Sequence, residues 1–139
     1  MTDEAIDQNP TTAQAVDELL QLLVACAREG VALPMTLYVK GTIVSGKLIG
    51  QHRFLTQWVE QFSSWMGDEA RETMRNAFGL DEPEPDYKDM DASDIRFIHL
   101  EEAKVFTPGQ NPLPSNGMLW RGRLTEVDGF SYGTFEVAE

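Results

Sequence analysis

The 139-residue chain has little of the side-chain chemistry that builds redox and metal sites. Cys26 is its only cysteine, so no disulfide bond and no zinc site of several thiolates can form within one chain. Because Cys26 lies in an apolar helical segment, we expect a buried thiol that packs as a small hydrophobic side chain. The two histidines, His52 and His99, each lack a second ligand at metal-binding spacing. We therefore expect neither a metal nor a cofactor.

Basic residues are also scarce. The chain has 11 Lys and Arg against 23 Asp and Glu, a formal net charge of -12. Nucleic-acid binding depends mainly on neutralising phosphates with Lys and Arg, so this charge balance argues against a nucleic-acid partner. The acids gather in residues 1–30 and 81–94, whereas residues 31–50 contain two lysines and no acid. Nucleic-acid binding is therefore disfavoured and stays open as an alternative.

No apolar run is long enough to cross a bilayer. The longest, Leu19 to Ala27, is interrupted by Gln21 and is far shorter than the ~20 residues that a spanning helix needs. The N-terminus is acidic where a secretory signal is basic. We expect a cytoplasmic protein without membrane contacts, with residues 1–10 as a mobile tail and residues 11–139 as a single domain.

Motifs of catalysis are missing as well. The sequence has no Gly-rich phosphate loop and no nucleophile elbow. Glu101 and Glu102 are adjacent on a predicted strand, so they point to opposite faces unless a bulge intervenes. We expect His99 to be buried and hydrogen-bonded or half-exposed, not a ligand. The chain is thus predicted not to be an enzyme. An enzyme with a pocket between helix 53–78 and the sheet is an alternative that needs converging polar groups.

Hydrophobic periodicity predicts the elements of the first half of the chain. They are a helix from Thr12 to Glu29, strands at Met35–Lys40 and Thr42–Ile49, and a helical segment from about residue 53 to residue 78. Thr11 or Thr12 is the expected cap of the first helix. Gly46 predicts a sharp bend or bulge in its strand. Gly67-Asp68 offers a break that divides the second helical segment, whose apolar stripe should pack on the sheet or on another copy of the chain.

The most biased segment is acidic. Residues 81–94 contain seven acids and two prolines, which predicts a solvated loop. Within it, Asp89, Asp91 and Ser93 have the spacing of the first ligands of a calcium loop. An EF-hand loop needs glycine and glutamate where this chain has Asp94 and Leu100, so calcium binding is only a weak alternative.

The C-terminal part reads as strands. Residues 95–106 form one, with an irregularity near Glu101-Glu102, and residues 107–116 form a loop rich in proline. Met118–Val127 and Phe130–Val137 are then predicted to pair as a hairpin that turns at Asp128-Gly129.

The predicted hairpin contains the candidate binding surface. Alternation places Trp120 and Gly122 on one face and the two arginines on the other. Gly122 indicates close approach of a backbone or a ring. Either Trp120 is a core residue and the arginines pair with the chain's own acids, or the arginines form a basic spot for an acidic partner. The candidate partner-binding residues are Trp120, Arg121, Arg123, Asp128 and Phe130.

These segments also show a family resemblance. Phe97-Ile98-His99-Leu100, Leu119-Trp120-Arg121-Gly122-Arg123-Leu124 and Glu126-Val127-Asp128-Gly129-Phe130 resemble the C-terminal half of the GvpU-type gas vesicle accessory family. Met35 to Gly50 is similar to the N-terminal strand pair of that family. The resemblance implies a non-enzymatic cytoplasmic protein that influences vesicle assembly or clustering through contacts with gas vesicle shell or accessory proteins. It supplies no catalytic residues.

A second likeness concerns the fold. The order of a helix, short bent strands and a closing Arg-Gly strand is similar to the Sm-like barrel. We therefore expect a mostly β chain with helices (α+β), built as a small bent barrel of about five strands. The first helix would cap the barrel, and residues 51–94 would be a helical and acidic-loop insertion. The likeness implies a homo-oligomer, and its alternative function is binding of RNA or an oligonucleotide.

Overall fold

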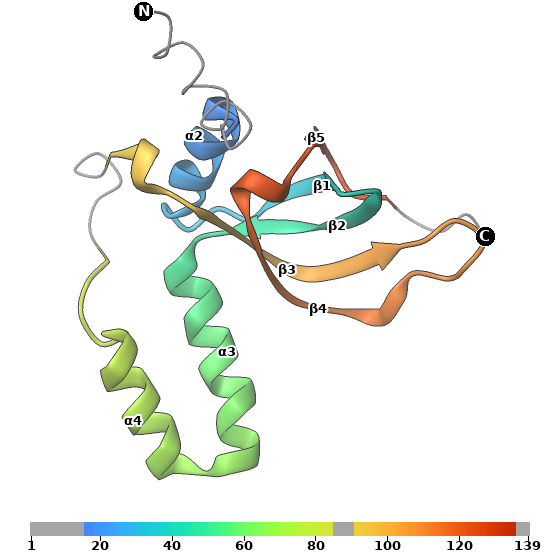
Figure 1. Cartoon of the computed structure of the whole chain (residues 1–139). Coiled ribbons are helices and arrows are strands. Elements are labelled where there is room, and N and C mark those ends of the chain that lie inside the picture. The colour runs from blue at the N-terminus through green and yellow to red at the C-terminus, as the bar shows by residue number, and fades with distance from the viewer. Residues whose placement is uncertain (1–15, 85–90, 136–139) are drawn as a thin grey trace, which may run out of the picture.

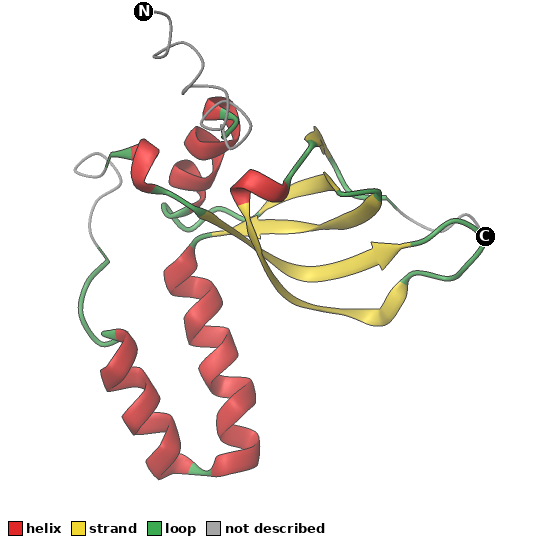
Figure 2. Cartoon of the chain, viewed as in Figure 1, coloured by secondary structure: helices red, strands yellow, loops and turns green. Residues whose placement is uncertain are grey.

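The structure, a computed structural model, describes residues 16–84 and 91–135. Within these residues the fold is α+β, as predicted, and it contains one antiparallel five-stranded sheet and three α-helices (Figures 1 and 2). The helices are α2 (Glu18–Ala27), α3 (Gln51–Met66) and α4 (Asp68–Phe78). The strands are β1 (Leu33–Val39), β2 (Thr42–Ile49), β3 (Phe97–Phe106), β4 (Leu113–Arg123) and β5 (Gly129–Tyr132), and the 3-10 turns are η2 (Ala92–Asp94) and η3 (Leu124–Glu126). The predicted tail lies outside the described residues.

Helix α2 starts later than predicted. Asp17 caps it, and the Oδ1 atom of this residue accepts hydrogen bonds from the backbone N–H groups of Leu19 and Leu20 at 2.9 and 3.3 Å. Thr11 and Thr12, the predicted caps, lie outside the described residues. Cys26 is exposed, so its predicted burial was wrong. At 100° per residue Cys26 falls on the outer face of the helix, opposite the stripe that packs on the sheet.

The strand order is β4-β3-β2-β1-β5, with every neighbouring pair antiparallel. The turn at Lys40-Gly41 joins β1 to β2 as predicted. The predicted hairpin at Asp128-Gly129 was wrong, because β4 pairs with β3 and β5 pairs with β1, at the opposite edge of the sheet. Turn η3 separates the two strands, and the backbone N–H of Asp128 donates to the carbonyl of Tyr38 at 2.7 Å, which directs the chain onto β1.

A bulge in β3 is accommodated by glycines on both neighbouring strands. Glu102 has a positive φ of 53°, and the pairing register shifts beside it on both sides. A Cβ atom on Gly46 of β2 would lie 2.9 Å from the Cα atom of Ala103, and one on Gly117 of β4 would lie 2.8 Å from the Cα atom of Glu102. The irregularities predicted at Gly46 and near Glu101-Glu102 are thus both parts of the β3 bulge.

The main core lies between α2 and one face of the sheet. Its most buried side chains, each at 0% exposure, include Leu20, Leu37, Leu48, Ile98 and Leu100. Strand β4 begins at Leu113, inside the loop predicted for residues 107–116. Its second residue is Pro114, which an edge strand can accommodate because one side of it forms no ladder hydrogen bonds.

The helical segment forms a hairpin of its own. It is inserted between β2 and β3 and divides at Gly67, as predicted. Helices α3 and α4 lie side by side and extend away from the sheet (Figure 1). Only Phe54 and Val59 of α3 are buried, and no residue of α4 is. The hairpin therefore contacts the sheet mainly at its base, and its far end reaches into solvent.

Candidate functional site

The five residues of the predicted binding surface lie on two edges of the sheet. Trp120, Arg121 and Arg123 are on β4, whereas Asp128 and Phe130 lie at the start of β5 on the other edge. The structure therefore brings the first three together and separates them from the last two, since the hairpin that would have joined them does not form.

Two of the five residues, Trp120 and Phe130, pack against the hydrophobic core. Trp120 is half-buried against the core, and its ring covers Gly122, where a Cβ atom would lie 2.8 Å from the Cζ3 atom of the indole. This confirms the predicted close approach of a ring at Gly122. Phe130 is half-buried against the same core and pairs with Leu37 across β1.

Asp128 is an exposed turn residue with a structural contact. Its Oδ2 atom accepts a hydrogen bond from the backbone N–H of Lys40 at 2.9 Å, and the Nζ atom of Lys40 lies 3.5 Å from Oδ1. Asp128 thus ties the chain before β5 to the β1–β2 turn.

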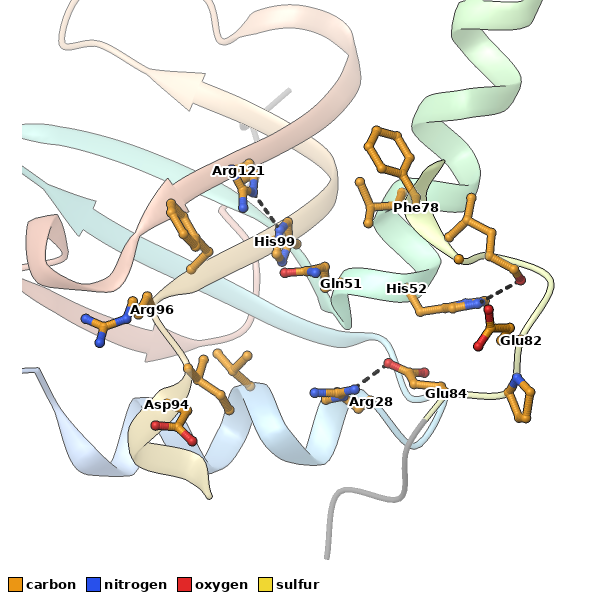
Figure 3. A pocket seen from close by; sticks show the side chains of 17 residues that line it. Arg28, Gln51, His52, Phe78, Glu82, Glu84, Asp94, Arg96, His99 and Arg121 are labelled. Carbon is orange, nitrogen blue, oxygen red and sulfur yellow. Dashed lines mark hydrogen bonds and ion pairs between the residues drawn. The ribbon is translucent and has the colours of Figure 1, made fainter. Parts of the chain in front are cut away.

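A cavity of about 420 Å³ lies where α2, the base of the helical hairpin and the ends of β3 and β4 meet (Figure 3). Its position corresponds to the pocket between helix 53–78 and the sheet that the alternative prediction of an enzyme requires. Its polar and charged lining residues are Arg28, Gln51, His52, Glu82, Glu84, Asp94, Arg96, His99 and Arg121. Its walls come from segments far apart in the sequence, so no sequence pattern identifies it.

His99 is the most perturbed titratable group at this cavity. Its side chain is 1% exposed, and the ring packs against Phe54 with 4.6 Å between centroids. Nε2 of His99 accepts a hydrogen bond from Nε of Arg121 at 3.1 Å, so the proton of the neutral ring resides on Nδ1. Burial, and then the charge of Arg121, lower the pKa of His99 to about 4. His99 is therefore buried, hydrogen-bonded and neutral at pH 7, as the sequence predicted in part.

Three of the other polar lining residues have partners within the protein. Nε2 of His52 lies 3.2 Å from the carbonyl oxygen of Leu80, and Arg28 forms an ion pair with Glu84 at 3.1 Å. The lining contains no Ser, Thr, Cys, Lys or Tyr among the described residues. In residues 16–84 and 91–135, no group of three His, Cys, Asp or Glu side chains could hold a metal. This lining suits binding of a charged group better than it suits nucleophilic catalysis.

A second polar cluster anchors α3 to the sheet. Glu101 is 7% exposed and accepts two hydrogen bonds from Arg53, at 3.0 and 2.9 Å, and one from Gln57 at 2.7 Å. Glu102 instead points to Lys47 at 3.4 Å, so the two adjacent glutamates share no site. Sequence reasoning did not find this cluster. Its signal was Arg53 and Gln57 one helical turn apart, on the face of α3 that meets β3.

The Arg53–Glu101 pair is expected to respond unequally to removal of either partner. In the variant Arg53→Met the buried carboxylate of Glu101 keeps only Gln57 as a partner, which should cost about 3 kcal/mol of the free energy of unfolding. In Glu101→Gln the Arg53 side chain, 43% exposed, can be hydrated, so a loss of about 1 kcal/mol is expected. Urea unfolding at pH 7 measures both losses, and an equal or reversed order would contradict this geometry.

The sequence of this chain matches one known protein family. The family model described as gas vesicle protein GvpU-like matches residues 17–135. The chain belongs to the GvpU-like family. The resemblance predicted from the two strand regions is thereby confirmed, and this GvpU-like chain is a gas vesicle-related protein. No curated protein and no solved structure matches it.

The match to the GvpU-like family also spans the segment between the strand regions. It includes α3, α4 and every described residue that lines the cavity. The projecting hairpin is therefore part of the GvpU-like domain of this chain. None of the described helices is both long and apolar enough to cross a membrane.

Proposed function

We propose that this GvpU-like chain is a non-enzymatic, cytoplasmic accessory protein that influences gas vesicle assembly or clustering through contacts with shell or other accessory proteins. Family membership supports the vesicle role. The observation that best supports contact with another protein is Trp65, which is 88% exposed at the far end of the α3–α4 hairpin.

The hairpin holds this tip in place through contacts of its own. Trp58 stacks on Phe62 with 5.4 Å between ring centroids, and Arg71 of α4 forms an ion pair with Glu60 of α3 at 2.8 Å. These contacts lie between the base and the tip, so Trp65 is not needed for them. An aromatic side chain that is mostly in water contributes little to folding and much to an interface when a partner covers it.

The tip carries the two most exposed large hydrophobic side chains of the hairpin. Met66, next to Trp65, is 58% exposed and is followed by Gly67, where the chain turns into α4. Tryptophan is the residue type most enriched among the interface positions that dominate binding energy, and methionine adapts to irregular surfaces. We assign the tip, Trp65 and Met66, to contact with a gas vesicle shell or accessory protein.

Replacement of Trp65 tests this assignment. Affinity-tagged protein, recovered under gentle lysis from a cell that forms gas vesicles, is expected to bring down vesicle shell or accessory proteins. Trp65→Ala should reduce that recovery about tenfold, the effect of losing roughly 1.4 kcal/mol or more of binding free energy. Tyr132→Ala is the matched control, because Tyr132 is 79% exposed on β5, and it should leave recovery unchanged. Recovery of no vesicle protein by the unaltered chain would refute the proposal.

RNA binding, the alternative that the Sm-like likeness implies, has one observation in its favour. Arg96 lies directly before the start of β3, beside Arg121 and Arg123 at the end of β4. Against RNA binding stands the net charge of -12, which opposes binding of a long polyanion. Self-association, implied by the same likeness, remains a prediction that sedimentation analysis of the purified chain can test.

A further inference from the structure

In the part of the chain that the structure describes, some Lys and Arg side chains have no carboxylate partner. Of the 11 Lys and Arg residues, ten lie in the described part of the chain, since Lys88 falls outside it. Six of the ten form ion pairs with carboxylates: Arg28, Lys40, Lys47, Arg53, Arg71 and Arg75. The four without a carboxylate partner among the described residues are Arg96, Lys104, Arg121 and Arg123. All four are on β3, on β4 or directly before β3.

Three of these four gather at one end of the sheet. Arg121 and Arg123 are two residues apart on β4, so they lie on one face about 7 Å apart. Arg123 pairs with Phe97 of β3, and Arg96 directly precedes Phe97. Arg96 and Arg121 both line the cavity (Figure 3). We call Arg96, Arg121 and Arg123 the arginine patch.

Arg121 is held in an orientation that suits a carboxylate. The carbon of its guanidinium group lies 3.8 Å from the centroid of the Phe97 ring, and its Nε–H is committed to His99. These two contacts fix the plane of the group and leave its two Nη atoms available. A fixed guanidinium with both Nη groups available matches the two oxygens of a carboxylate.

We propose that the arginine patch binds an acidic peptide segment of a partner protein, with one carboxylate on the Nη groups of Arg121 and neighbouring acids on Arg96 and Arg123. All three arginines are exposed, and Arg121 and Arg123 lie on the edge strand β4, so an extended segment can reach them from the side. This site is separate from the hairpin tip and does not depend on which protein supplies the segment.

The surroundings of the patch favour a short acidic peptide over a nucleic acid. Charges are screened within about 8–10 Å at physiological salt, so a short segment experiences mainly the three arginines. A long polyanion would extend beyond them over a protein of net charge -12.

Fluorescence anisotropy with a defined probe tests the proposal. The probe is a fluorescein-labelled ten-residue peptide of alternating glutamate and serine, titrated with the full chain at low salt. Arg123→Gln should weaken binding about fivefold, as expected for loss of one charge-assisted contact. Lys104→Gln is the control, because it removes the same charge from a β3 residue outside the patch, opposite Ser45, that also has no carboxylate partner among the described residues. It should change the affinity less than twofold.

A variant of Arg121 and an RNA probe extend the experiment. Arg121→Lys keeps the charge and removes the planar fork, so it should weaken binding of the peptide about fivefold. Circular dichroism confirms that each variant is folded. Absence of peptide binding, equal weakening by Lys104→Gln and Arg123→Gln, or tighter binding of a ten-nucleotide uridine RNA than of the peptide would each overturn the proposal.

Discussion

Replacing Gly46 with alanine is expected to lower the free energy of unfolding by about 3 kcal/mol. The new methyl group would lie 2.9 Å from both the Cα atom of Ala103 and the carbonyl oxygen of Glu101. Both are backbone atoms of the bulged strand, so relief requires β2 and β3 to separate. That movement would also disturb Glu101, whose carboxylate anchors α3.

A matched glycine controls for the general effect of adding a methyl group. A Cβ atom on Gly129 would meet only the ring of Tyr38, at 3.8 Å, which is ordinary contact. Gly129→Ala should therefore change the free energy of unfolding by less than about 1 kcal/mol, in either direction. Urea unfolding followed by tryptophan fluorescence compares the two variants. A Gly46→Ala variant as stable as Gly129→Ala would show that the bulge does not press on β2.

The stability of the protein is expected to fall by about 3 kcal/mol from pH 7 to pH 4 on account of His99 alone. The pKa of His99 is lowered to about 4 in the folded protein, against 6.5 for an unperturbed histidine. Below pH 6.5 the unfolded chain therefore binds a proton that the folded chain does not. The folded state loses stability through this interval and loses no more below about pH 4, where both states are protonated.

Carboxylates also titrate between pH 7 and pH 4, so the contribution of His99 is measured as a difference between two proteins. Free energies of unfolding of the unaltered chain and of His99→Gln are compared at several pH values from 7 to 4, and the common contribution of the carboxylates cancels. The advantage of the unaltered chain should shrink steadily below pH 6.5. A difference between the unaltered chain and His99→Gln that stays constant would contradict the burial of a neutral ring.

Much of the fold follows from local patterns. Alternation and helical periodicity predicted the five strands, the division of the helical segment at Gly67 and the irregularities at Gly46 and near Glu101. These succeeded because each is caused by a residue's own preferences and those of its neighbours in the chain. The contact between Trp120 and Gly122 was predictable for the same reason, since residues two apart share a face of a strand.

Pairing of the last strand was not predictable locally. Asp128-Gly129 has the composition of a hairpin turn, but Leu124 is buried at 2% exposure within η3, which moves the chain to the other edge of the sheet. There Asp128 binds the backbone of Lys40, so a tertiary contact outweighed the turn preference.

The candidate sites depend still more on tertiary structure. The cavity and the arginine patch need α2, α3 and β3–β4 to be placed together, and nothing in the spacing of Arg96, Phe97 and Arg121 predicts it. The sequence did leave open whether the two arginines of β4 pair with the chain's own acids. Within the described residues they do not.

Flotation with purified gas vesicles is the most direct test of the central proposal, that this chain contacts vesicle proteins through the tip of its hairpin. Vesicles rise on centrifugation because they contain gas, and a bound protein rises with them. The unaltered chain at micromolar concentration should move to the buoyant layer, together with Tyr132→Ala, while Trp65→Ala stays largely in solution. If the unaltered chain remains in solution, or if Trp65→Ala floats as well as Tyr132→Ala, the proposal is contradicted.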